Sequence, residues 1–359
     1  MARISSWPSR SALVALGLTA GIVACGDKDF PETVVVPVNN AFTQTNLVAD
    51  VAGAGARTID TNLVNPWGLV FGANGALWVA NNGTGTSTAY DASGNILPIV
   101  VHIADAAGTG KGAPTGMVAN PTTDFAIPGV GGSAFIWAGE NGTISAWNSS
   151  SNDSAHVIVN RPNSVYKGIA MATNAGANFI YLTDFKNNNV DVFDGTFTLI
   201  RSFTDATIPA GYAPFGIANL NGLLYVTFAK QKAPDNVDDD PGVGNGFVDV
   251  FTQDGQLVKR FASNGRLNSP WAVVAAPSPF GQFNNVILIG NFGDGQIGAY
   301  DATSGALIDV MRAPGGSPIA IPGLWGLAFG PSAGSTTLYF AAGGADETHG
   351  LVGTLTPTP

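Results

Sequence analysis

Short runs of alternating apolar and polar residues fill the chain between about residues 45 and 355, and glycine, proline, asparagine or aspartate bounds each run. A period of two is typical of half-buried antiparallel strands, and no segment keeps the 3.6-residue period of an amphipathic helix. The runs 67–71, 77–80, 87–90 and 96–103 predict four consecutive strands. The pattern therefore predicts an all-β fold.

The group of four strands recurs along the chain. Each group opens on a small or aromatic residue, a glycine and then apolar residues, as in Asn65-Pro-Trp-Gly-Leu-Val-Phe71. The glycine, or the alanine that replaces it, falls at Gly68, Gly116, Gly168, Gly216, Ala272 and Gly326. These spacings of 48, 52, 48, 56 and 54 residues suit one four-stranded blade each. We therefore expect a six-bladed β-propeller over residues 42–356, with blades that start near residues 65, 113, 166, 213, 269 and 323.

The two ends of this domain complement each other. The last group stops after its third strand at Leu355, whereas one unassigned strand, Thr45–Val51, precedes the first group. Pairing of this N-terminal strand with the last blade closes the ring and covers an exposed sheet edge.

The N-terminal segment reads as an export signal. Arg3 and Arg10 precede an apolar run of 12 residues that is too short to span a bilayer. The following Ile22-Val-Ala-Cys25 resembles a bacterial lipobox, and Cys25 is the only cysteine. We expect a lipoprotein signal peptide at 1–24, a lipidated (palmitate-bearing) Cys25, a tether over 25–41, and anchoring in the cell envelope, with the outer membrane favoured. The alternative is an ordinary signal peptide with an incidental cysteine.

Charge narrows the range of partners. Two of the 15 basic residues lie in the leader, so 13 remain against 25 acidic residues and the mature chain carries a net charge of −12. Such a chain repels nucleic acid, but cations, neutral molecules and basic proteins remain open as partners. A single cysteine also excludes an internal disulfide and a cysteine metal cage.

Propeller geometry indicates where activity would lie. The starts of the first strands and the ends of the second strands of all blades converge near the axis on one face. Aromatic and basic side chains at these positions favour a binding cleft. They are Trp67, Lys167, Phe215, Trp271 and Trp325, with Lys230 just beyond. The alternative is that the aromatic residues only pack between blades.

The same face carries oxygen ligands. Asn81, Glu140, Asp184 and Asn291 end second strands and offer the hard oxygen atoms that Ca²⁺ or Mg²⁺ prefers, so calcium is the one cofactor we consider. Capping of strand ends is the alternative role. The loop 230–245 adds a second acidic group, Asp235, Asp238, Asp239 and Asp240, as a weak calcium-loop pattern or as a solvated loop.

Two further motifs carry little weight. Gly330-Pro-Ser-Ala-Gly334 matches the nucleophile-elbow pattern, but no helix follows Ser332. His349, near Asp346 and Glu347, is the only histidine on the expected active face, where a surface histidine is more frequent than a base.

Several longer phrases resemble a family of secreted bacterial propellers of unknown function, some of which end in a PEP-CTERM sorting signal. The phrases are Asn62-Leu-Val-Asn-Pro-Trp-Gly68, Trp78-Val-Ala-Asn-Asn-Gly-Thr-Gly85, Gly244-Asn-Gly-Phe-Val-Asp-Val-Phe251 and Gly323-Leu-Trp-Gly-Leu-Ala-Phe329. The resemblance implies export and a propeller similar to NHL-type ones, and it implies no catalytic residues. Here a lipobox takes the place of the sorting signal as the expected anchor.

The chain lacks a complete set of catalytic residues, so we expect an envelope-anchored module that binds or scaffolds a protein or a small molecule. The alternative is a divalent-metal-dependent hydrolase of the lactonase or gluconolactonase type, with one axial cation held by the four oxygen ligands above. An electron-transfer propeller is disfavoured, because no haem motif is present.

Overall fold

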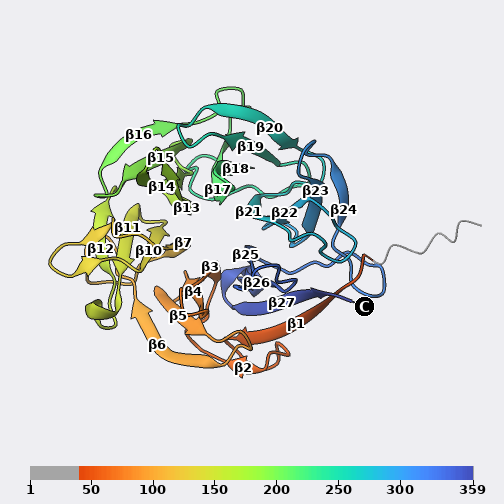
Figure 1. The fold of residues 1–359 in the computed structure, drawn as a ribbon, viewed down its shortest axis with the longest axis horizontal. Helices are drawn as coiled ribbons and strands as arrows, with labels where there is room; N and C mark the ends of the chain where they lie inside the picture. The colour runs from red at the N-terminus through yellow and green to blue at the C-terminus, as the bar shows by residue number, and fades with distance from the viewer. Residues whose placement is uncertain (1–39, 359) are drawn as a thin grey trace, which may run out of the picture. The chain divides into compact units, whose positions relative to one another are not determined.

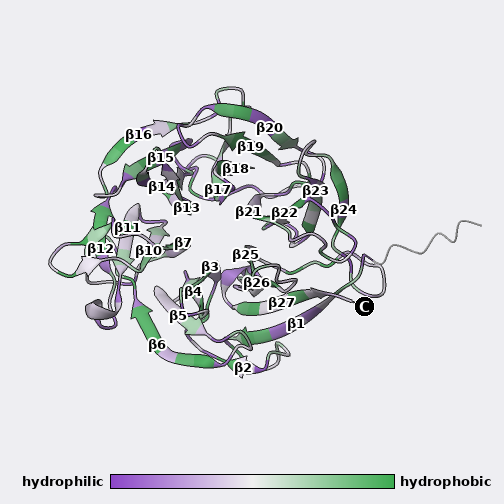
Figure 2. Cartoon of the chain, viewed as in Figure 1, coloured by the Kyte–Doolittle hydropathy of each residue, from purple (hydrophilic) through white to green (hydrophobic). Residues whose placement is uncertain are grey.

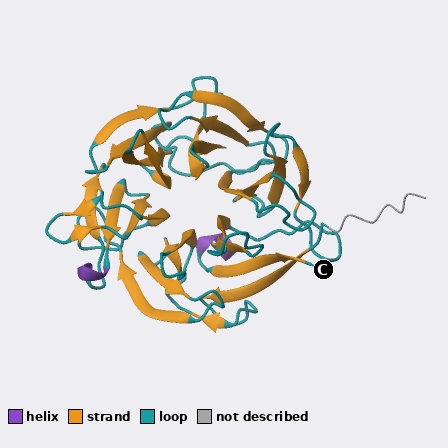
Figure 3. Cartoon of the chain, viewed as in Figure 1, coloured by secondary structure: helices purple, strands orange, loops and turns teal. Residues whose placement is uncertain are grey.

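The computed structural model describes residues 40–358. Within this range strands dominate (Figure 3), and the short helical turns are η1 (Ser149–Ser151) and α1 (Gly344–Glu347). No helix of the described range has the length and apolar character needed to cross a membrane. The expected signal peptide, Cys25 and the tether as far as residue 39 lie outside the described residues.

Five four-stranded antiparallel sheets follow one another around a central axis (Figure 1). Blade 1 consists of β3 (Pro66–Phe71), β4 (Leu77–Asn81), β5 (Thr86–Tyr90) and β6 (Ile96–His102). Blade 2 consists of β7 (Pro114–Ala119), β10 (Phe135–Gly139), β11 (Thr143–Trp147) and β12 (His156–Asn160), with the small hairpin β8 (Ala126–Ile127) and β9 (Gly131–Gly132) inserted after β7. Blade 3 consists of β13 (Tyr166–Asn174), β14 (Ala177–Asp184), β15 (Asn189–Asp194) and β16 (Leu199–Phe203). Blade 4 consists of β17 (Tyr212–Leu220), β18 (Leu223–Lys230), β19 (Gly246–Phe251) and β20 (Leu257–Ser263). Blade 5 consists of β21 (Pro270–Ala275), β22 (Val286–Asn291), β23 (Ile297–Asp301) and β24 (Leu307–Val310).

The sixth sheet joins the two ends of the domain. Its order is β2-β1-β27-β26-β25, formed by β25 (Leu324–Phe329), β26 (Leu338–Ala342), β27 (Leu351–Pro357), β1 (Phe42–Ala49) and β2 (Thr58–Ile59). β1 pairs antiparallel with β27 from Phe42 opposite Pro357 to Ala49 opposite Leu351. The predicted six-bladed propeller and its closure by the N-terminal strand are confirmed.

The contact with blade 5 begins two residues before β1. The Asn40 side-chain amide donates to Asp309 Oδ2 and to the Val310 carbonyl, both at 2.8 Å. Ala41 forms a β-bridge with Arg312. Asn40 and Ala41, which we expected at the end of the tether, therefore pack on the propeller.

The repeated glycine has a steric cause. A Cβ at Gly68 would lie 2.8 Å from the backbone nitrogen of Met117, and one at Gly116 would lie 2.8 Å from that of Ile169. In each case the obstructing backbone belongs to the next blade. Glycine is therefore required where the innermost strands of neighbouring blades come into backbone contact.

Buried hydrogen bonds also tie blades together near the axis. Thr115 Oγ1 donates to the Tyr166 carbonyl and Thr183 Oγ1 donates to the Phe215 carbonyl, both at 2.8 Å. Such bonds are strong in a low-dielectric interior, and an unpaired carbonyl there would be costly. Side chain–backbone bonds thus join blade 2 to blade 3 and blade 3 to blade 4.

Hydrophobic residues lie along the strands, including outermost ones such as β6 and β20 (Figure 2). All residues of β4, β10 and β26 are buried. On the outer strands, by contrast, Ile96, Leu257 and Ile308 are exposed. One hydrophobic cluster contains Leu47 and Val48 of β1 together with residues of blades 1 and 6, so β1 packs against both.

A test of ring closure follows from the packing of Leu47, which is 5% exposed. Leu47→Ala should lower the free energy of unfolding by about 2–5 kcal/mol, because it removes buried methyl groups and leaves a cavity. Leu257→Ala is the matched control at a 43% exposed position, and it should change the stability by less than about 0.5 kcal/mol. Urea unfolding measures both. Equal effects of the two substitutions would mean that β1 is not part of the cooperative core.

Candidate functional site

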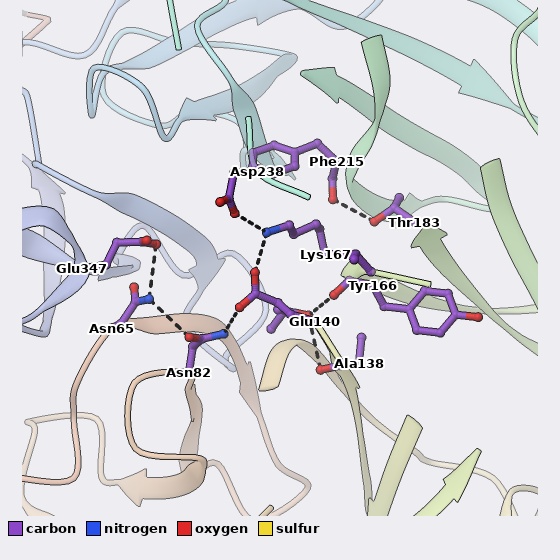
Figure 4. A network of polar contacts seen from close by, with 12 residues as sticks. Asn65, Asn82, Ala138, Glu140, Tyr166, Lys167, Thr183, Phe215, Asp238 and Glu347 are labelled. Atoms are coloured by element: carbon purple, nitrogen blue, oxygen red, sulfur yellow. Dashed lines mark hydrogen bonds and ion pairs between the residues drawn. The ribbon is translucent and has the colours of Figure 1, made fainter. Parts of the chain in front are cut away.

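Polar side chains from several blades meet around the buried ammonium group of Lys167, the second residue of β13 (Figure 4). The Lys167 side chain is only 3% exposed, and its Nζ lies 2.5 Å from Glu140 Oε1 and 3.5 Å from Asp238 Oδ1. The ammonium also lies 5.2 Å from the ring centroid of Trp67. An ammonium so far from water requires these partners, because desolvation without them would neutralise it.

A chain of amides extends this cluster to blades 1 and 6. Asn82 Nδ2 donates to Glu140 Oε2 at 2.8 Å, and Asn65 Nδ2 lies 3.5 Å from Asn82 Oδ1 and 3.2 Å from Glu347 Oε1. Trp325 Nε1 in turn donates to Asn65 Oδ1 at 3.2 Å. The network therefore links Glu140 of blade 2 to Glu347 in the β26–β27 loop. We call Lys167, Glu140, Asn82, Asn65, Glu347, Asp238 and Asp239 the axial cluster.

The acidic loop between β18 and β19 covers Lys167, on the face we expected. Gln231 Nε2 donates to the Phe185 carbonyl of the neighbouring blade at 2.6 Å, which pins the loop. Asp238 reaches Lys167, whereas Asp240 Oδ2 pairs with Lys230 Nζ at 2.5 Å, away from the cluster. Asp235 is exposed.

The pKa values show an excess of negative charge. Burial alone would lower the pKa of Lys167, but the charge and hydrogen bond of Glu140, with Asp238 and Asp239, raise it above the ordinary value. Burial raises the pKa of Glu347, against the hydrogen bond from Asn65. Burial also raises the pKa of Asp239, and Lys167 opposes that shift. The Lys167 ammonium is thus the counter-charge for four carboxyl groups, and the pKa values of two of them, Asp239 and Glu347, are raised.

The predicted aromatic residues form one packed cluster at the axis. Trp67 stacks on Trp325 with ring centroids 3.4 Å apart, and Trp271 and Phe215 each lie 5.7 Å from Trp325. All four are buried. Trp271 Nε1 also donates to the Lys167 carbonyl at 3.0 Å. These residues pack between blades, which is the alternative role that the sequence left open.

The four predicted oxygen ligands of a cation each make polar contacts with other groups of the protein. Glu140 binds Lys167, and Asp184 accepts from the Val165 backbone N–H at 3.2 Å and from Asn187 Nδ2 at 2.8 Å. Asn291 Oδ1 likewise accepts from the Asn268 N–H at 3.2 Å, and Asn81 Nδ2 donates to two threonine hydroxyls of its own blade. In residues 40–358, moreover, no group of three or more His, Cys, Asp or Glu side chains could hold a metal ion. The axial calcium ion and the metal-dependent hydrolase therefore stay predictions.

Two hollows lie near the aromatic residues. A pocket of about 330 Å³ beside the axial cluster is lined by Phe292, Asp346 and Glu347, among others. Phe292 stacks on Trp325 at 4.0 Å and so joins this pocket to the aromatic cluster. A second hollow of about 390 Å³ is lined by residues of the innermost strands that follow the repeated glycines, such as Leu69 and Met117.

Sequence comparison finds relatives in a giant virus. The chain is 32% identical over 324 residues to the uncharacterised protein R648 of Acanthamoeba polyphaga mimivirus, with 86% of this chain and 78% of that protein covered. It is 35% identical over 320 residues to the uncharacterised protein L690 of the same virus, with coverage of 84% and 82%. The chain belongs to the family of these mimivirus proteins. No family model matches it.

Among solved structures, this chain is similar to six-bladed propeller lyases. A streptogramin B lyase superposes with a TM-score of 0.50 at 14% identity, over 88% of this chain and 97% of that one. A catalytically inactive virginiamycin B lyase of Staphylococcus aureus, with quinupristin, superposes with a TM-score of 0.50 at 16% identity, over 88% and 99%. At this identity the likeness shows the fold alone.

The backbone of this chain is strained around Glu347. Ala345, Asp346 and Glu347 have φ values of 52°, 53° and 63°, so three consecutive non-glycine residues adopt the left-handed conformation. Asn65, which binds Glu347, has a φ of 48° before Pro66. Each such residue costs about 1–2 kcal/mol, and strain of this kind gathers at functional sites.

Sequence reasoning placed Lys167, Glu140 and Asp238 on one face, where the structure brings them into contact, but it missed Asn65 and Asn82. Asn65 directly precedes the Pro-Trp-Gly phrase, and Asn82 directly follows Asn81, one of the predicted oxygen ligands. Neighbouring asparagines at the ends of a first and a second strand were the available signal.

Removal of the buried ammonium tests the axial cluster. Lys167→Met should lower the free energy of unfolding by about 3 kcal/mol at pH 8, because it leaves buried carboxylates without a counter-charge. The pKa values of Glu347 and Asp239 are raised in the folded protein, so these two carboxyl groups stabilise it at acid pH, and this contribution is lost as the pH rises through their pKa values. The loss of stability in Lys167→Met should therefore be smaller near pH 4 than at pH 8. Urea unfolding at both pH values measures this.

The double variant Lys167→Met/Glu140→Gln is the control. It should recover part of the loss, because the partner charge goes with the ammonium. Simple addition of the two single effects would show that Lys167 and Glu140 are not coupled.

Proposed function

We propose that this protein is a binding module whose axial face recognises a basic ligand, such as an amine or the lysine side chain of a protein. The observation that carries this is the surplus of carboxyl groups around one internal ammonium. Lys167 already shows how the cluster accepts such a group, with Nζ 2.5 Å from Glu140. Glu347 and Asp346 remain on the wall of the adjoining pocket for a second cation.

The pocket suits an alkylammonium in shape as well as in charge. Its volume of about 330 Å³ falls at the lower end for small-molecule sites. Phe292 offers a ring face beside the acids, and a cation held there gains both ion pairing and a cation–π contact. The acidic chain as a whole, with a net charge of −10, attracts cations over long range and adds to the rate of association.

The test compares 1,5-diaminopentane with 1,5-pentanediol, which has the same length and no charge. Calorimetric titration at low salt should detect the diamine and not the diol, and added salt should weaken binding because screening reduces ion pairing. Glu347→Gln should weaken diamine binding about tenfold, since a charge-assisted hydrogen bond becomes neutral.

The matched control is Asp153→Asn, which removes an exposed carboxylate outside the axial cluster. It should leave diamine binding unchanged. Equal binding of diamine and diol, or equal effects of Glu347→Gln and Asp153→Asn, would contradict the proposal.

We also propose that the protein is exported, as the bacterial resemblance implies, and that a lipid on Cys25 holds it on the cell envelope. The lipobox Ile22-Val-Ala-Cys25 after a short apolar run supports this. The outer membrane is favoured because Gly26 follows the cysteine, where an aspartate would resemble a signal for retention in the inner membrane. Several acyl chains on one residue give the stable attachment that a single chain cannot.

Expression of the full chain in a bacterium with labelled palmitate tests the anchor. The wild type should incorporate label and sediment with membranes, whereas Cys25→Ala should do neither. An unlabelled wild type that is recovered in the soluble fraction would contradict the anchor and leave the axial-ligand proposal unaffected.

A further inference from the structure

An aspartate–histidine pair lies outside the axial cluster, where the N-terminal strand meets the last blade. His349 Nδ1 lies 2.7 Å from Asp50 Oδ2, although the two residues are 299 positions apart. Asp50 is itself held, because its Oδ1 accepts from the Gly350 N–H at 2.9 Å. The Asp50 side chain is 6% exposed and that of His349 is 47% exposed, so a fixed carboxylate orients a partly open imidazole.

The carboxylate also selects the tautomer of the ring. Asp50 can only accept a hydrogen bond when ionised, so in the neutral imidazole Nδ1 carries the proton and Nε2 is left as an acceptor. No hydrogen bond of Nε2 occurs among residues 40–358. A histidine arranged in this way presents one oriented acceptor.

This pair lines a pocket of about 470 Å³. The other walls are mainly aliphatic and come from three parts of the chain: Val51–Ala54 after β1, Ala320–Pro322 before β25, and Leu351 at the start of β27. A small-molecule site typically combines such apolar walls with a few fixed polar groups. The pocket shares Pro322 and Ala345 with the pocket of the axial cluster, so the strained α1 turn separates the two.

We propose that this second pocket binds a small apolar molecule that carries one N–H or O–H donor, which it presents to Nε2 of His349. An aromatic N-heterocycle of the size of indole fits this description. The site differs from the axial cluster in chemistry, because its walls are apolar and its one oriented polar atom is a neutral acceptor. A ligand there would contact both β1 and blade 6, and would thus stabilise the ring closure by an amount that grows with the logarithm of the ligand concentration above its Kd.

The experiment uses three probes of similar size on the full chain. Indole only donates a hydrogen bond, 1-methylindole can neither donate nor accept one strongly, and acetophenone only accepts. Calorimetric titration of the wild type should show indole binding about tenfold more tightly than either of the others. The ¹⁵N shift of His349 Nε2 should move with indole and not with 1-methylindole.

Two variants separate the role of the histidine from a structural one. In Asp50→Asn the side-chain amide can donate to Nδ1, which shifts the proton to Nε2, so the preference should reverse toward acetophenone. In His349→Phe the ring shape stays but the acceptor is gone, so indole and 1-methylindole should bind equally. His349→Phe decides the matter if Asp50→Asn does not fold.

Val51→Trp fills the pocket from a position that is 38% exposed, and Val51→Ala is its matched control. The tryptophan variant should abolish binding of all three probes, and the alanine variant should retain it. Equal affinity of the wild type for indole and 1-methylindole, or undiminished binding by Val51→Trp, would overturn the proposal. Both results are independent of diamine binding at the axial cluster.

Discussion

The antiparallel pairing of β1 with β27 is the constraint on which the rest of the structure depends. Six blades form a ring only if the first and last are joined, and here the hydrogen bonds of one strand pair supply the joint. The same pairing brings Asp50 to His349 and seats blade 1 beside blade 6, where Asn65 reaches Glu347. The Asp50–His349 pair and the link from the axial cluster to Glu347 therefore depend on contacts between residues 299 and 282 positions apart, which ring closure brings together.

Within the closed ring, the buried ammonium of Lys167 organises the axial face. Its desolvation is tolerated because carboxylates of neighbouring blades surround it, and their mutual repulsion is in turn tolerated because of its charge. The result is a rigid, acid-rich surface beside an aromatic floor, on a fold that is shared with lyases of the streptogramin type. Since that likeness extends to the fold alone, function has to be sought in these side chains rather than in the architecture.

The repeat made the fold predictable, whereas the site was only partly so. The glycine phrases mark backbone contacts between blades, which are a property of the architecture and recur with it. The direction of a side chain at a strand end is decided by the local turn instead. Asp184 and Asn291 turn toward the N–H groups of Val165 and Asn268, which neither spacing nor charge reveals. Glu140 was placed on the right face, but its partner is a lysine of the next blade, and a cation ligand and an ion-pair partner look the same in a sequence.

The four packed aromatic residues near the starts of the innermost strands limit how solutes can move through the middle of the ring. Trp67 and Trp325 stack at 3.4 Å in the middle of the ring, and the hollow of about 390 Å³ lies beyond them along the same strands. A solute in that hollow would have to displace these buried, stacked rings to reach the axial cluster. The two faces of the propeller can therefore bind different ligands independently of each other.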